Sequence, residues 1–134
     1  MTARPRGRRV LVVEDEIIVS WNLQDMLSDL GCEVVGPAVR VDEALGMIDG
    51  IDAAVLDVNL GGQTSFAIAD ALAARGVPFA FSTGYEKDSL PDDYRTFPVL
   101  RKPFHRSEVA ELLAKLWAPD PGPPSREGQG EGAA

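Results

Sequence analysis

The sequence predicts an α/β domain with a parallel β-sheet that is covered by helices on both faces. Short apolar runs alternate along the chain with longer segments whose apolar residues recur at every third or fourth position, the period of a helix face. The short runs are apolar throughout rather than at every second residue, as strands are when both faces of a sheet are buried. Strict alternation of strands and helices indicates a doubly wound arrangement.

The predicted strands are short and rich in Val, Leu, Ala and Phe, which favour buried sheets. The second one is expected to be closed by the Gly36-Pro37 pair, since proline rarely continues a strand. The strands are residues 10–13, 33–35, 53–56, 79–82 and 99–100.

Helical periodicity follows most of these strands, and glycines mark several helix ends. Between residues 85 and 97, Pro91 and a pair of acidic residues make a full helix improbable, so a short or irregular helix is expected there. The other predicted helices run from Val19 to Leu30 with Gly31 as the stop, from Val41 to near Gly50, from Ser65 as the N-cap to Gly76, and over residues 109–116.

Length and charge limit the function classes. A chain of 134 residues with a net charge of −8 predicts one domain, and it argues against nucleic acid as a direct partner because phosphate contacts need a basic face. No apolar run is long enough to span a membrane, so a cytoplasmic protein is expected. We expect a flexible basic N-terminus over residues 1–7, the folded domain over 8–118, and a disordered tail rich in Pro, Gly and Glu over 119–134.

Polar side chains stand directly after the predicted strands. Because the carboxyl ends of parallel strands meet at one edge of a sheet, these side chains should lie close together. They are Glu14, Asp15 and Glu16 after the first strand, Asp57 after the third, Thr83 after the fourth and Lys102 after the fifth.

Several carboxylates on one edge require a cation to neutralise them, and oxygen ligands with room for water suit Mg²⁺. The single histidine, His105, gives no indication of zinc. Mg²⁺ with a central Asp57, an ammonium and a hydroxyl is a set suited to phosphoryl transfer, in which Asp57 is the nucleophile. Taken singly, each residue also has a structural interpretation, and Glu16 is interpreted as a charge or cap at a helix N-terminus.

These residues resemble the receiver domains of two-component response regulators. The resemblance rests on the motifs VLVVEDE, AAVLDVNLGG, FSTGY and LRKPF, in order and with the spacing of the family. It implies a flavodoxin-like (βα)5 fold with strand order 2-1-3-4-5. It further implies that Asp57 accepts a phosphoryl group from a phosphohistidine on a sensor histidine kinase or a histidine phosphotransfer protein.

The resemblance also implies the metal ligands. Glu14 and Asp15 match the acidic pair of the family, in which Asp15 binds Mg²⁺ directly and Glu14 acts more often through a bound water. Asp57 and the backbone carbonyl of Asn59 complete the protein ligands.

The remaining roles concern the phosphorylated state. Thr83 would donate a hydrogen bond to a phosphoryl oxygen, and Lys102 would form an ion pair with it, aimed by a cis bond to Pro103. The aromatic switch residue that many receivers carry on the fifth strand is replaced here by Val99. FSTGY resembles a subgroup in which the aromatic follows the threonine, which assigns part of the switching to Tyr85, although Tyr85 could also simply pack on the surface.

The predicted function is therefore a phosphoacceptor switch rather than an enzyme, acting only on its own phosphorylation and slow dephosphorylation. Its output would be altered protein contacts at the surface formed by the fourth helix, the fifth strand and the last helix, toward an unknown target, as a monomer or weak dimer. Two alternatives stay open: a phosphorylation-independent interaction module, and a Mg²⁺-dependent phosphohydrolase with an aspartate nucleophile, for which Asn59 stands where a second aspartate is usual. The chain is expected to be a complete small protein, although a piece of a longer protein is also possible.

Overall fold

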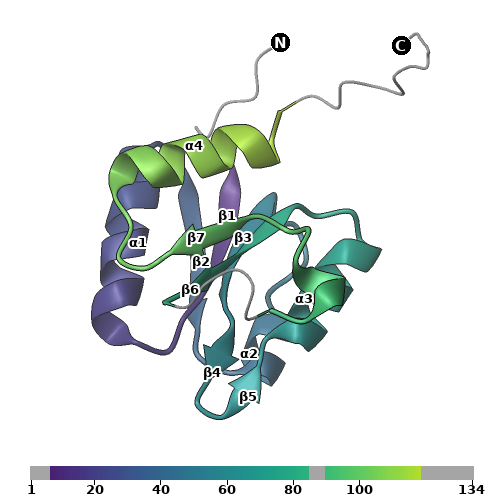
Figure 1. Cartoon of the computed structure of the whole chain (residues 1–134). Coiled ribbons are helices and arrows are strands. Elements are labelled where there is room, and N and C mark those ends of the chain that lie inside the picture. Colours follow the sequence, from purple (N-terminus) through teal and green to yellow (C-terminus); the bar gives the residue numbers. More distant parts are fainter. Residues whose placement is uncertain (1–6, 85–89, 119–134) are drawn as a thin grey trace, which may run out of the picture.

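A parallel five-stranded sheet forms the centre of the protein. The computed structural model describes residues 7–84 and 90–118. The strands lie in the order β2-β1-β3-β6-β7 and all neighbours are parallel (Figure 1). They are β1 (Arg9–Val13), β2 (Glu33–Ala38), β3 (Ala53–Asp57), β6 (Phe79–Thr83) and β7 (Val99–Arg101). The predicted fold class and strand order are confirmed.

Helices cover both faces of this sheet (Figure 1). Helices α1 (Ile17–Asp29) and α4 (Arg106–Leu116) pack on one face, and α2 (Val41–Leu45) and α3 (Phe66–Ala74) pack on the other. A small antiparallel hairpin, β4 (Asn59–Leu60) with β5 (Gln63–Thr64), follows β3 and was not predicted.

Strand β1 shows why the strands are apolar throughout. Val10 and Val12 belong to the core under α1 and α4, whereas Leu11 and Val13 belong to the core under α2 and α3. All four side chains are at most 1% exposed. A central strand between two helical layers thus buries both of its faces, which removes the polar alternation of a half-exposed strand.

Strand β2 and helix α2 end at other residues than predicted. Strand β2 does not stop at Gly36-Pro37 but continues to Ala38. Gly36 adopts a φ of +92°, the bond to Pro37 is cis, and the register against β1 shifts there. Strand β2 lies at the edge of the sheet, so one of its sides pairs with no other strand. An edge strand tolerates a proline because the missing N–H costs no hydrogen bond on the unpaired side. Helix α2 ends at Leu45, before Gly46, rather than near Gly50, since glycine is a poor helix former.

The segment after β6 contains a single 3₁₀ helix, η2 (Asp92–Tyr94), within its described part, residues 90–97. Tyr94 stacks on Phe66 with ring centroids 4.2 Å apart, and its hydroxyl donates a hydrogen bond of 3.0 Å to Asp70. These contacts attach the segment to α3. The predictions for residues 85–89, which include Tyr85, and those for residues 1–6 and 119–134 lie outside the described residues.

Within the described ranges 7–84 and 90–118, no helix combines the length and the apolar character needed to cross a membrane.

Candidate functional site

The parallel sheet brings the predicted polar residues to one edge, where the Lys102 ammonium lies among carboxylates. Its Nζ is 2.9 Å from Glu14 Oε1, 3.1 Å from Glu16 Oε1 and 3.4 Å from Asp57 Oδ1. The three acidic residues come from the ends of β1 and β3, and Lys102 follows β7. Residues more than 80 positions apart in the chain, such as Lys102 and Glu16, are therefore in direct contact.

The inner part of this cluster is buried. Glu14, Asp57 and Thr83 are 2%, 7% and 4% exposed, respectively. The backbone fixes Glu14, because its N–H donates to the Ala38 carbonyl at 3.0 Å and its carboxylate accepts the Glu16 N–H at 3.0 Å. Buried carboxylates with defined partners are characteristic of functional sites.

The strand ends also set the direction of Lys102. Its backbone N–H donates a hydrogen bond of 2.9 Å to the carbonyl of Thr83, which ties it to the last residue of β6. The bond from Lys102 to Pro103 is cis, in agreement with the resemblance. The ammonium thus points into the site rather than toward solvent, and only 15% of the side chain is exposed.

The surroundings within the cluster raise the pKa of both Asp57 and Lys102. Burial, together with the hydrogen bond and the charge of Glu14, raises the pKa of Asp57 to about 7, and this outweighs the lowering effect of Lys102 and of the Asn59 backbone. Burial disfavours the charged form of Lys102, but its hydrogen bond to Glu14 and the charges of Asp57 and Glu14 dominate, so that the pKa of Lys102 is raised. One ammonium thus compensates the carboxylate charge only partly.

The donor set fits a divalent metal ion. One oxygen each of Glu14, Glu16 and Asp57 can be chosen so that all three lie within 4.8 Å of one another. Hard carboxylate oxygens with access to water are the ligands that Mg²⁺ prefers. Asp15 is exposed and lines the same depression, together with Asn59. The metal-ligand roles predicted for Glu14, Asp15, Asp57 and Asn59 stay predictions.

The depression over the cluster has a volume of about 550 Å³, enough for an ion and a phosphoryl group. Its lining includes the predicted strand-end residues other than Glu14. It is formed by Asp15, Glu16, Asp57, Asn59, Gly61, Thr83, Gly84 and Lys102.

Glu16 is the residue whose role the sequence did not predict. It occupies the N-cap position of α1, as expected, but its side chain makes no capping hydrogen bond and instead pairs with Lys102. Ser65 likewise occupies the N-cap position of α3 without a side-chain cap, and its buried hydroxyl has no partner within the described residues. The position of Glu16 before a helix predicts a cap from the sequence. Its ion pair with Lys102 is visible only in the folded structure.

The raised pKa of Asp57 predicts a pH-dependent stability. An acid whose pKa is higher in the folded than in the unfolded state stabilises the fold below its unfolded pKa and loses this contribution as pH rises through the folded value. Without divalent cations, the free energy of unfolding should therefore fall from about pH 4 to about pH 7. Asp57→Asn should abolish most of this fall and stabilise the protein at pH 8 by on the order of a few kcal/mol.

Urea unfolding of both proteins at several pH values, in chelator, measures this difference. Asp52→Asn serves as a control, because Asp52 precedes β3, at the end of the strand away from Asp57, and pairs with the Arg9 backbone outside the cluster. A parallel pH dependence in wild type and Asp57→Asn would contradict the prediction.

The structure is similar to solved response regulator structures. SdrG from Sphingomonas melonis Fr1 shares 44% identity with a TM-score of 0.75, over 85% of this chain and 98% of that chain. The BeF3-activated conformation of SdrG from Pseudomonas melonis Fr1 shares 45% identity with a TM-score of 0.74, over 88% of this chain and 100% of that chain. The REC domain of the response regulator PhyR from Erythrobacter litoralis shares 26% identity with a TM-score of 0.71, over 87% and 96% of the two chains.

A curated relative is the transcriptional regulatory protein PdtaR of Mycobacterium tuberculosis, which is 30% identical over 112 residues and 79% of this chain. The chain spans about half the length of this relative, 55%. No protein-family model matches the chain. The near end-to-end similarity to SdrG, the strand order and the edge cluster together establish that the chain belongs to the receiver domains of response regulators.

Proposed function

We propose that the protein is a phosphorylation-controlled switch that accepts a phosphoryl group on Asp57 from a phosphohistidine. The observation that carries this proposal is the convergence of Asp57, Lys102 and Thr83 around one depression, with Glu14 buried beside them. A nucleophile, a cation and a hydroxyl so placed match the charges that move in phosphoryl transfer.

The residues have distinct parts in the reaction. Asp57 Oδ attacks phosphorus in line, the new O–P bond forms, the P–N bond to the donor imidazole breaks, and its electron pair returns to the imidazole nitrogen. Lys102 offsets charge on the phosphoryl oxygens, and the Thr83 hydroxyl donates to one of them. Glu14, Asp15, Asp57 and the carbonyl of Asn59 would hold Mg²⁺, which supplies further positive charge to the phosphoryl oxygens when bound.

A small-molecule donor tests this acceptor chemistry. With acetyl phosphate and Mg²⁺, intact-mass measurement should show one added phosphoryl group on the wild-type chain and none on Asp57→Asn. Lys102→Met should reduce the phosphorylated fraction strongly, because the cation that offsets the transferred charge is lost.

The same measurement separates the alternatives. Continuous release of phosphate that depends on Asp57 and consumes the donor without a stable adduct would favour a phosphohydrolase. An unchanged mass in the wild type would favour a phosphorylation-independent interaction module.

The donor protein has to approach over the first turn of α1, which carries an apolar patch. Ile17, Ile18 and Trp21 are 62%, 65% and 61% exposed, and they follow Glu16 at the rim of the depression. At spacings of three and four along a helix, they share one face. Exposed large apolar side chains that gather beside a reactive site indicate a protein contact.

A second depression continues this surface. It lies between α1 and the residues after β7, has a volume of about 210 Å³ and includes Lys102 in its lining, together with Val19, Asn22, Pro103 and Phe104. A donor seated on this surface would therefore present its phosphohistidine beside Lys102, whose ammonium lies 3.4 Å from the acceptor Asp57. We define the patch of Ile17, Ile18 and Trp21 with this depression as the donor surface.

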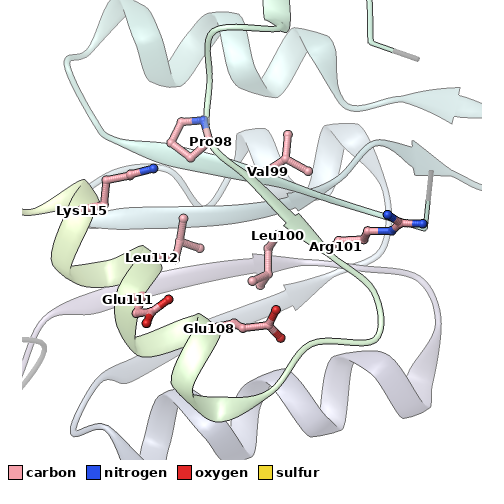
Figure 2. A pocket seen from close by; sticks show the side chains of 8 residues that line it. All are labelled: Pro98, Val99, Leu100, Arg101, Glu108, Glu111, Leu112 and Lys115. Carbon is pink, nitrogen blue, oxygen red and sulfur yellow. The ribbon is translucent and has the colours of Figure 1, made fainter. Parts of the chain in front are cut away.

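The output surface is proposed at the opposite side of Lys102, between β7 and α4. Figure 2 shows Leu112 and Lys115 of α4 facing Pro98 and Leu100 across a groove of about 440 Å³. Its floor is apolar, whereas Arg101, Glu108 and Glu111 place charges of both signs on its rim. Because β7 ends one residue before Lys102, movement of Lys102 toward a phosphoryl group bears directly on this groove.

The donor surface predicts a selective loss of protein-mediated phosphorylation. The donor for this test is a phosphorylated histidine phosphotransfer protein that is active on the wild-type chain. Trp21→Ser should slow transfer from this donor by about tenfold or more, as expected for an aromatic side chain that becomes buried when the donor binds. The rate with acetyl phosphate should not change, because Trp21 is not among the residues that line the depression over the acidic cluster. Stopped-flow or quench-flow transfer assays measure both rates.

Leu45→Ser is the matched control, since Leu45 is 39% exposed but lies on α2, at the other face of the sheet. Equal slowing with both kinds of donor, or equal slowing in Leu45→Ser, would argue against the donor surface.

A further inference from the structure

Glu16 forms an ion pair with Lys102, although its N-cap position in α1 would be expected to direct its side chain to the helix backbone. Its carboxylate lies 3.1 Å from the Lys102 ammonium, closer than Asp57 at 3.4 Å. The ammonium of Lys102 has three protons to donate. It donates a hydrogen bond to Glu16, and Glu14 lies at hydrogen-bond distance from it. Asp57, the proposed acceptor, is the most distant of the three carboxylates.

We propose that Glu16 is a positioning residue that holds the Lys102 ammonium in the unphosphorylated state and competes for it with the phosphoryl group on Asp57. This inference rests on the proposed function and assigns its regulation to Glu16, one of the three carboxylates of the cluster. Occupation of Asp57 by a phosphoryl group then requires Lys102 to exchange Glu16 for a phosphoryl oxygen.

Burial identifies Glu16 rather than Glu14 as the partner that Lys102 releases. The Glu14 side chain is 2% exposed, so a Glu14 carboxylate without its cation would be buried and uncompensated, which is costly. The Glu16 side chain is 63% exposed, so its carboxylate is hydrated by water as soon as Lys102 leaves. Ion pairs of exposed carboxylates are weak and exchange readily.

The place of Glu16 in the fold makes its released state favourable as well. Glu16 lies at the N-cap position of α1, where the unpaired backbone N–H groups favour a negative charge. The carboxylate can therefore lose Lys102 and still lie near a partial positive charge. This gives the site two charge arrangements of similar free energy, as a switch requires.

The experiment compares the affinity for beryllofluoride, a phosphoryl mimic, in the wild type, Glu16→Gln and Glu16→Asp at saturating Mg²⁺. Glutamine removes the charge. Aspartate keeps the charge at the helix N-terminus but is one methylene shorter, so that its carboxylate no longer reaches Lys102. The shift of the Thr83 amide signal in NMR spectra reports binding at the site, and thermal unfolding verifies that each variant is folded.

We expect both variants to bind beryllofluoride about threefold to fivefold more tightly than the wild type, the range of an exposed ion pair. Tighter binding by Glu16→Gln with wild-type affinity in Glu16→Asp would overturn the inference, because charge at the rim and not contact with Lys102 would then be responsible. Equal or weaker binding by both variants would overturn it too. A wild-type protein that binds no beryllofluoride would overturn the proposed function itself, and the inference with it.

Discussion

The Lys102 ammonium compensates three carboxylates at the carboxyl edge of the sheet, and the site depends on this compensation. Glu14 and Asp57 are buried there, where unpaired charges are costly. Burial, together with the hydrogen bond and the charge of Glu14, raises the pKa of Asp57 despite the nearby ammonium. A site in which three carboxylates share one ammonium favours the binding of a further cation.

The topology places the proposed donor surface and the proposed output surface on either side of this ammonium. Lys102 lines the depression beside α1, and the strand that precedes it forms one wall of the groove against α4. A donor on the first surface and a target on the second would therefore both sense the position of one side chain.

Much of this arrangement could be predicted from the sequence, because a parallel sheet brings the residues after its strands to one edge whatever the details of the loops. This rule is enough to predict that Asp57, Thr83 and Lys102 lie at the same edge of the sheet. The ion pair of Glu16 could not be predicted, since the position before a helix indicates a cap and the partner lies 86 residues away. The continuation of β2 through Pro37 depends on an edge position and a positive φ at Gly36, and neither is encoded in a local pattern.

The most direct test of the account is the titration of the Asp57 carboxyl carbon by NMR, in chelator, in the wild type and in Lys102→Met. The account predicts a midpoint near the pKa of about 7 in the wild type and a higher midpoint once the cation is removed. A wild-type midpoint close to the ordinary value of an aspartic acid, about 4, together with no change in Lys102→Met, would contradict it.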